Sequence, residues 1–347
     1  MRVLVANAGS SSLKLSLLDS DDSELWRREL PAERGGFDDD AVRAGLDELP
    51  QRPDVVGHRI VHGGERFRDA VLLDADVRAA VKELTALAPL HQPKSLAAID
   101  ACDRALRDVP AVGCFDTAFH ATLPQAAAAY ALRPDWGAAH GVRRYGFHGL
   151  SHAYAARAAG DAGRVVTCHL GAGASLCAVL DGSSVDTTMG FTPLEGLVMA
   201  TRSGSVDPGL LLWLQQQRGV SVDDLAHALE YESGLLALAG TADMRELLAR
   251  DDERAQLARD VYVHRLRAGI AAMAAALGGL DALVFTGGVG EGSARIRELA
   301  CDGLGYLGVG PPEERVRVLV VRAREDLEIA RQVRELLAPQ GERSDPR

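Results

Sequence analysis

The chain has 347 residues, of which 47 % are hydrophobic and 25 % charged, so it has the composition of a globular protein and enough length for two domains. Lysine and arginine total 38 against 49 acidic residues, and the net charge of −11 excludes a general electrostatic attraction for nucleic acid or an anionic membrane. No long apolar run follows the N-terminal segment, and we therefore expect neither a signal peptide nor a spanning helix, and a cytoplasmic location. The 5 cysteines include no CxxC pair, which favours reduced thiols over a disulfide frame.

The first predicted elements are two strands joined by a loop of small residues. Residues 3–6 have the pattern of a buried strand, 7–11 form a tight Gly/Ser loop, and 12–18 have the alternating character of a second strand. The same order returns later in the chain, with a strand at 165–169, a loop at 170–174 and a strand at 175–180. We interpret the repetition as a duplicated fold element.

A third glycine loop, at 286–292, follows an apolar strand at 282–285 and precedes a helix at 293–300. Apolar periodicity predicts further helices at 74–87, 95–106, 210–217, 224–229, 252–277 and 325–337. This mixture indicates an α/β protein. Three glycine loops that each end a strand favour one nucleotide site, although any one of them is equally well explained as a plain turn.

Backbone N–H groups can approach phosphate oxygens closely in such loops, and the hydroxyls of Ser10 and Ser12 add donors. The sequence contains no Gly-Lys-Ser/Thr, which excludes a Walker A loop, and the third loop is not GxGxxG, which weakens a Rossmann interpretation. Two phosphate-handling hairpins followed by a strand, loop and helix are instead similar to the nucleotide-binding architecture of actin, hexokinase and Hsp70.

Seven polar segments in chain order carry a more specific resemblance. They are NAGSSSLK at 7–14, GHRIVHGG at 57–64, LHQP at 90–93, FDTAFH at 115–120, RYGFHGLSH at 144–152, MGFTPLEG at 189–196 and TRSGSVDP at 201–208. Together they resemble the acetate and propionate kinase family over nearly the whole chain. The resemblance implies reversible phosphoryl transfer from ATP to acetate, giving acetyl phosphate and ADP, and a homodimer. A propionate, butyrate or other short-chain carboxylate kinase remains the alternative within enzymes, and a catalytically silent nucleotide-binding module remains the alternative outside them.

The implied fold consists of two duplicated actin-like (RNase H-like) α/β domains with an interdomain cleft. We expect the N-terminal domain at 1–147, joined by a returning C-terminal helix at 326–338, and the nucleotide-binding domain at 148–325. The polar tail at 339–347 is expected to be flexible.

The resemblance also implies catalytic roles, which suit phosphoryl transfer because that reaction needs its oxygens neutralised. Arg59 and Arg202 would hold the substrate carboxylate and the transferring phosphoryl group, His148 would stabilise the transition state, and Asp116 would be the active-site carboxylate. Taken alone, Arg59 could be an ordinary ion-pair residue and Asp116 a helix cap. His148 and His152 could form a zinc pair, but Gly149 lies between them and no third ligand is evident.

Further implied contacts concern the two substrates and a metal ion. Val61, Leu90, Phe147 and Pro193 would surround the methyl group of acetate, although isolated apolar residues are otherwise core residues. Asn7 and Glu325 would hold Mg²⁺, with Mn²⁺ as a substitute. The residues assigned to the phosphates are Lys14, Ser10, Ser12, His169, Leu170, Gly171, Ala172 and Gly173, and those assigned to adenosine are Asp243, Met244, Arg245, Gly288, Val289, Gly290, Glu291 and Gly292. Asp243 could equally be the N-cap of a helix.

Two positions depart from the family pattern. Where the family has asparagine in the second phosphate loop and near the end of the third loop, this chain has Ala172 and Gly292. The loss of two amide side chains predicts weaker binding of ATP.

Overall fold

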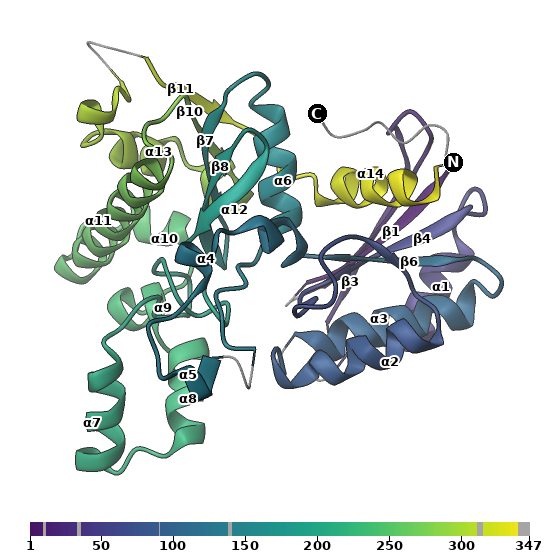
Figure 1. Cartoon of the computed structure of the whole chain (residues 1–347), viewed down its shortest axis with the longest axis horizontal. Coiled ribbons are helices and arrows are strands. Elements are labelled where there is room, and N and C mark those ends of the chain that lie inside the picture. The colour runs from purple at the N-terminus through teal and green to yellow at the C-terminus, as the bar shows by residue number, and fades with distance from the viewer. Residues whose placement is uncertain (10–11, 33–35, 90, 138–140, 311–314, 339–347) are drawn as a thin grey trace. The chain divides into compact units, whose positions relative to one another are not determined.

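The computed structural model describes residues 1–9, 12–32, 36–89, 91–137, 141–310 and 315–338 (Figure 1). Its contacts divide the chain into two compact units. Unit 1 comprises residues 1–121, 147–154 and the segment from 324 onward, and unit 2 comprises 122–146 and 155–323. The sequence-based boundary at residue 147 placed 122–146 in the first domain, whereas these residues pack within unit 2. The predicted flexible tail lies outside the described residues.

Unit 1 is built on a six-stranded sheet in the order β3-β2-β1-β4-β6-β5. The strands β1, β2 and β3 form an antiparallel meander, β4 and β6 continue the sheet parallel to β1, and β5 pairs antiparallel with β6. Their bounds are Val3–Ala8 for β1, Ser12–Leu18 for β2, Glu24–Pro31 for β3, Val55–Ile60 for β4, Val71–Leu72 for β5 and Ala111–Phe115 for β6.

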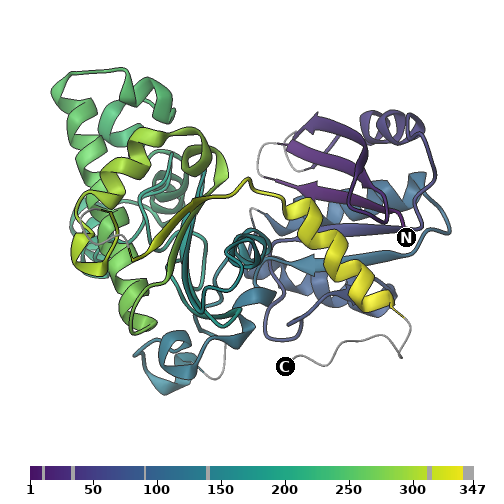
Figure 2. The same ribbon diagram turned by 90° about the horizontal axis from the view of Figure 1, so that it is seen from above.

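Alternation along β1 distributes its side chains between the two faces of this sheet. Val3 and Val5 pack with Ile329 of α14 (Glu325–Leu337), whereas Leu4 and Ala6 join a core that includes residues of α1 (Asp39–Asp47) and α3 (Gln92–Ala105). Figures 1 and 2 show α14 on one face of this sheet and α1, α2 (Ala75–Glu83) and α3 on the other. The C-terminal helix is therefore an integral layer of unit 1.

Unit 2 repeats this topology with a five-stranded sheet in the order β11-β10-β7-β8-β9. The strands β7, β8 and β9 form an antiparallel meander, and β10 and β11 run parallel to β7. Their bounds are Arg164–Leu170 for β7, Ala174–Leu180 for β8, Ser183–Thr187 for β9, Ala282–Thr286 for β10 and Arg317–Val320 for β11. Read from β9 to β11, this is the order of β3-β2-β1-β4-β6 in unit 1, which confirms the predicted duplication.

The remaining helices are mostly short. In unit 2 they are α4 (Gln125–Ala128), α5 (Pro134–Gly137), α7 (Pro208–Arg218), α8 (Val222–Tyr231), α9 (Gly234–Ala239), α10 (Met244–Leu248), α11 (Glu253–Ala276), α12 (Gly287–Gly292) and α13 (Ala294–Cys301); α6 (Gly149–Ala158) begins in unit 1 and ends in unit 2. Short 3₁₀ turns occur at Leu84–Ala86, Ala118–Thr122 and Gly305–Leu307. None of the helices in the described ranges is both long enough and apolar enough to cross a membrane.

One prediction about local structure was wrong. The third glycine segment, 286–292, was expected to be a loop, but Gly287–Gly292 forms the short helix α12. Ser293 ends α12 and caps α13, because its extended backbone breaks the helix while its hydroxyl accepts a hydrogen bond from the Ile296 N–H at 3.2 Å. Two consecutive helices therefore replace the expected loop and single helix.

His58, in β4, lies in the core with only 1 % of its surface exposed, and neither ring nitrogen has a hydrogen-bond partner among the described residues. Burial lowers the pKa of His58 to about 4, from an ordinary value of 6.5. Between these values the unfolded chain binds more protons, so stability rises with pH by up to about 1.4 kcal/mol per pH unit from this residue.

We therefore expect the stability of the protein to fall as the pH is lowered from 6.5 towards 4. Urea unfolding at pH 7 and pH 5 should show a smaller difference for His58→Leu than for the wild type. The exposed His227 supplies the matched control, His227→Gln, which should retain the wild-type difference. An unchanged difference in His58→Leu would contradict the assigned cause.

Candidate active site

Three predicted site residues lie at the same edge of the unit 1 sheet. Asn7 is near the end of β1, Arg59 is near the end of β4, and Asp116 directly follows β6. These strands are adjacent and parallel, so their carboxyl ends meet, which is where α/β sheets place ligands. The topology thus brings together side chains that are 52 and 57 positions apart in the sequence.

Arg59 is held by a short ion pair with Asp116. Its Nη2 and Nε donate to Asp116 Oδ2 at 2.6 and 3.0 Å, and its Nη1 donates to Asn7 Oδ1 at 3.3 Å. The Asp116 side chain is 1 % exposed and that of Arg59 is 13 % exposed. This pairing favours a role for Asp116 in orienting the guanidinium over the alternative interpretation, in which Asp116 only caps a helix.

The electrostatics of this pair follow from burial and from its acidic neighbours. Burial alone would lower the pKa of Arg59, but the charges of Asp116 and Glu325 raise it, so the guanidinium remains charged. Burial raises the pKa of Asp116 above its ordinary value, while Arg59 opposes that shift. The site therefore presents a permanent cation in a largely water-excluded position.

Asp116 also seats the beginning of α6. Its carbonyl oxygen accepts a hydrogen bond from the Gly149 N–H at 3.0 Å, and a Cβ at Gly149 would lie 2.0 Å from that oxygen. The preceding residue, His148, has a φ of +57°, an uncommon conformation for a side-chain-bearing residue. Such backbone strain clusters at functional sites, which supports the assignment of His148.

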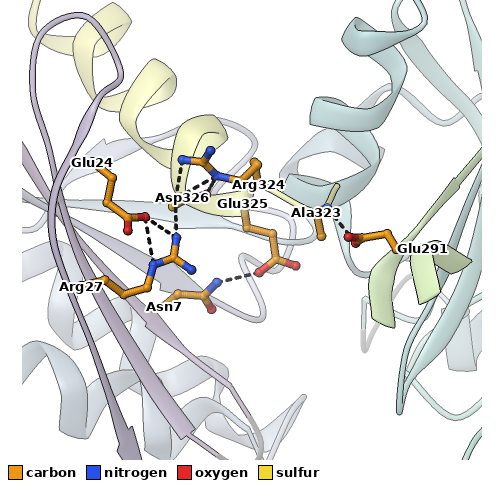
Figure 3. Close-up of polar contacts among 8 residues, drawn as sticks. All are labelled: Asn7, Glu24, Arg27, Glu291, Ala323, Arg324, Glu325 and Asp326. Atoms are coloured by element: carbon orange, nitrogen blue, oxygen red, sulfur yellow. Dashed lines mark hydrogen bonds and ion pairs between the residues drawn. The ribbon is translucent and has the colours of Figure 1, made fainter. Parts of the chain in front are cut away.

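The N-terminus of α14 adds Glu325 to this cluster. Asn7 Nδ2 donates to Glu325 Oε2 at 2.6 Å (Figure 3). The adjacent Asp326 accepts hydrogen bonds from Arg324 Nε at 2.9 Å and from Arg27 Nη2 at 3.4 Å, and Arg27 also pairs with Glu24. This network fixes the start of α14, and with it Glu325, to the meander of unit 1.

The donor atoms at this position suit Mg²⁺ better than zinc. Asn7 and Glu325 offer amide and carboxylate oxygens, which Mg²⁺ prefers, and Mg²⁺ keeps several waters, so two side chains suffice. Across the described ranges, no group of three or more His, Cys, Asp or Glu side chains is arranged to hold a metal. The ring centroids of His148 and His152 lie 6.5 Å apart, and a zinc site needs further ligands beyond such a pair.

The first predicted phosphate hairpin joins β1 to β2. Lys14 is exposed and stands opposite Asn7 in the strand register, and the Gly9 N–H closes the turn on Ser12 O at 2.8 Å. The Ser12 hydroxyl donates to Glu29 Oε1 at 2.6 Å, which engages it within the meander. Ser10, and Leu90 of the predicted methyl site, lie outside the described residues.

Two of the residues predicted to surround the methyl group are buried in unit 1. Val61 is 8 % exposed and Phe147 is 1 % exposed, and the ring of His62 meets that of Phe147 edge-on at 5.6 Å. Gln92, from the LHQP segment, holds His62 in place by hydrogen bonds to its backbone O at 3.1 Å and from its backbone N at 3.2 Å. Pro193 lies in unit 2. Their role in binding the methyl group stays a prediction.

The second predicted phosphate hairpin lies in unit 2. The Gly171 N–H bonds to Gly173 O at 2.9 Å and closes the turn between β7 and β8. His169, near the end of β7, pairs with Thr286 at the end of β10, so this hairpin and α12 are neighbours. Gly287 has a φ of +80°, and a Cβ there would lie 2.8 Å from Leu170 O. The second and third glycine segments therefore lie side by side, and their close approach requires glycine.

Glu291, predicted to contact adenosine, uses its side chain to fix the backbone. Its Oε1 accepts hydrogen bonds from the N–H groups of Gly287 at 3.0 Å and Ala323 at 2.8 Å, the latter shown in Figure 3. A Cβ at either Gly288 or Gly292 would meet nothing within 4 Å. A side chain at either position would therefore meet no neighbour, and Glu291 anchors the helix.

The segment that contains Arg202 lies beside the second hairpin. The Ala200 N–H donates to Ala172 O at 3.1 Å, which ties the Arg202 segment to the turn between β7 and β8. Arg202 Nε donates to Glu230 Oε1 at 2.6 Å, with both side chains largely buried. Sequence reasoning missed Glu230, because it occurs in an ordinary amphipathic helix.

The N-terminus of α10 contains the remaining predicted nucleotide residues. Asp243 is the N-cap of α10, as the alternative interpretation had it, and it accepts a hydrogen bond from the Arg245 N–H at 2.7 Å. Hydrogen bonds from Arg245 lower the pKa of Asp243 to about 2. Met244 is buried beneath them. An adenosine contact would therefore come from Asp243 and Arg245 rather than from the Met244 side chain.

The repeated meander, with two further parallel strands in each unit and glycine segments at the strand ends, defines a duplicated α/β protein of the actin and hexokinase type. The chain belongs to the Acetokinase family, whose profile matches residues 37–329. It is 43 % identical to an acetate kinase of Nostoc punctiforme over 97 % of this chain and 100 % of that protein.

Solved structures give the same result. The crystal structure of an acetate kinase from Porphyromonas gingivalis has a TM-score of 0.87 at 36 % identity and covers 97 % of this chain and 100 % of that one. A propionate kinase from Francisella tularensis has a TM-score of 0.86 at 34 % identity and covers 95 % of this chain and 98 % of that one.

Proposed function

We propose that this protein is an acetate kinase, which reversibly transfers the γ-phosphoryl group of ATP to acetate and releases acetyl phosphate and ADP. The observation that carries the proposal is the buried Arg59–Asp116 pair at the carboxyl edge of the parallel strands, in a member of the Acetokinase family. A fixed cation at such an edge suits a reaction that gathers two anions.

In the proposed mechanism a carboxylate oxygen attacks the γ-phosphorus directly, and the bond from that phosphorus to the β–γ bridging oxygen breaks, leaving the electron pair on ADP. Arg59, held by Asp116, orients the acceptor carboxylate. Arg202 and His148 neutralise charge on the equatorial oxygens of the transferring group. A covalent phosphoenzyme is the mechanistic alternative, and labelled protein trapped after incubation with labelled ATP alone would favour it over direct transfer.

We assign Mg²⁺ to Asn7 and Glu325, with Mn²⁺ as a substitute. When bound there with ATP, the ion would neutralise phosphate charge. Because Asn7 Nδ2 now donates to Glu325, the amide must turn to present its oxygen to a cation. The residues assigned to the nucleotide are Lys14, Ser10, Ser12, the segment 169–173, Asp243, Arg245 and the segment 288–292.

A longer acid is the second candidate substrate, because the Francisella tularensis relative is a propionate kinase. We propose that Val61 and Phe147, with Leu90 and Pro193, limit the length of the acid. One methylene group gives only about 1–3 kcal/mol of discrimination, so activity with both acids is expected.

We further propose a homodimer in the cytoplasm, where ATP is the phosphoryl donor. None of the residues of α7 is buried, and its Leu210, Leu212 and Trp213 are 46, 55 and 44 % exposed. An exposed apolar helix of this kind is typical of an interface between proteins. Sedimentation equilibrium should give a dimer for the wild type and a weaker one for Trp213→Ser with Leu212→Ser. A monomeric wild type would contradict the proposal.

The test of the function is to incubate the purified chain with Mg-ATP and, separately, with acetate, propionate and butyrate, while hydroxylamine traps any acyl phosphate. Hydroxamate formation with acetate at the highest kcat/KM is the expected result, and titration of ATP in the same assay measures the weakening expected from Ala172 and Gly292. Binding of Mg-ATP without hydroxamate from any acid would instead favour a silent nucleotide-binding module.

A further inference from the structure

Glu230 is an unusual residue for its position in the fold. It is the one buried residue of α8, whose other positions are exposed or half-buried. Burying a carboxylate costs free energy unless it is paired, and helices normally bury apolar side chains. Here the pairing partner is Arg202 at 2.6 Å. The one buried side chain of α8 therefore forms an ion pair rather than an apolar packing contact.

We infer that Glu230 is a positioning residue for phosphoryl transfer, acting by fixing the orientation of Arg202; this inference rests on the proposed function. Glu230 Oε1 accepts a hydrogen bond from Arg202 Nε, and Pro193 O accepts one from Arg202 Nη1 at 3.4 Å. Within the described part of the chain Nη2 has no partner. The guanidinium is a rigid planar fork, so fixing Nε sets the direction in which Nη2 donates.

Hydrogen bonds also fix the backbone around the Arg202–Glu230 pair. Thr201 Oγ1 donates to the carbonyl of Glu230 at 2.8 Å, and the Ser233 N–H donates to Thr201 O at 2.8 Å. Gly234 has a φ of +61°, and a Cβ there would lie 2.2 Å from Met199 O. The segment that carries Arg202 therefore packs against the junction of α8 and α9. Glu230 contributes to this contact through both its side chain and its carbonyl.

The same backbone contacts also set the position of Arg202 relative to the second phosphate hairpin. The Ala200 N–H, two residues before Arg202, donates to Ala172 O in that hairpin at 3.1 Å. An arginine that already holds the required orientation loses little conformational entropy when a phosphoryl oxygen arrives, and a misplacement of about 1 Å can cost about a hundredfold in rate. Glu230 is thus expected to affect kcat more than the KM for either substrate.

The experiment compares Glu230→Ala with Glu230→Gln, because glutamine retains an acceptor oxygen for Arg202 Nε without the charge. We expect kcat to fall by about ten- to a hundredfold in Glu230→Ala, with KM values within about threefold, and Glu230→Gln to recover most of the loss. Glu232→Ala is the matched control, because Glu232 lies two residues further on and its side chain is 64 % exposed. It should retain wild-type kinetics.

A double-mutant cycle separates positioning from a general structural role. In an Arg202→Ala background, Glu230→Ala should cause no further loss of kcat if it acts through Arg202. Losses that multiply, or a Glu230→Ala enzyme with wild-type kcat, would overturn the inference.

If the alanine variant does not fold, Glu230→Asp, which withdraws the carboxylate by one methylene, must lower kcat. A wild type that forms no acyl phosphate would refute the proposed function itself, whereas active wild type with an inert Glu230 would refute only this inference.

Discussion

Replacing Arg59 with alanine is expected to lower kcat/KM by at least about a hundredfold and to destabilise the protein by about 3–5 kcal/mol. The first effect follows because the acceptor carboxylate loses its fixed cation. The second follows because Asp116, 1 % exposed, would be left as a buried charge without its partner. Hydroxamate kinetics and urea unfolding at pH 7 measure the two effects separately.

The double variant Arg59→Ala with Asp116→Ala separates these two effects. Removal of both charges should restore much of the stability but none of the activity, because the unpaired buried carboxylate is gone while the cation is still missing. Arg28→Ala is the matched control, since Arg28 forms an exposed ion pair with Glu48 at 2.8 Å in the same unit and should cost less than about 1 kcal/mol. A double variant with wild-type turnover would remove Arg59 from the mechanism.

Replacing Arg202 with alanine should lower kcat by at least about a hundredfold, because the transition state loses a charge partner. Arg202→Lys should recover only part of the rate, since an ammonium group cannot pair with Glu230 and a phosphoryl oxygen in the same fixed plane. Steady-state kinetics with acetate and Mg-ATP provide the measurement. Unchanged turnover in the alanine variant would exclude Arg202 from the reaction. Arg133→Ala, which removes an exposed pair with Asp135 in unit 2, should be silent.

The predictable part of the fold was the part with strong apolar patterning. The central strands β1, β2, β7, β8 and β10 were all predicted, because each is a buried run bounded by glycine or small residues. The strands β3, β4, β5, β6, β9 and β11 were not predicted. Four of these, β3, β5, β9 and β11, are sheet-edge strands whose exposed or polar residues do not form a buried run. The other two, β4 and β6, are buried central strands that were missed despite their apolar residues.

The candidate site was predictable to a different degree in its two halves. Asn7, Arg59 and Asp116 were named from the family resemblance, and the parallel pairing of β1, β4 and β6 brings the three residues to one edge of the sheet. Glu230 could not be found in this way. Glu230 stands two residues from the exposed Glu232 in the same acidic stretch, and no local pattern indicates that the first is buried and the second is not. The pairing of Glu230 with Arg202 is a tertiary contact between residues 28 positions apart in the sequence.

The most direct test of the account is the origin of the oxygen that bridges carbon and phosphorus in the product. The chain should be supplied with Mg-ATP and acetate labelled with ¹⁸O in its carboxylate, and the acyl phosphate followed by ³¹P NMR. Transfer of the phosphoryl group to a carboxylate oxygen predicts a phosphorus signal with the isotope shift of a bridging ¹⁸O, together with stoichiometric ADP. No acyl phosphate signal from a chain that still binds Mg-ATP would contradict the assignment as a carboxylate kinase.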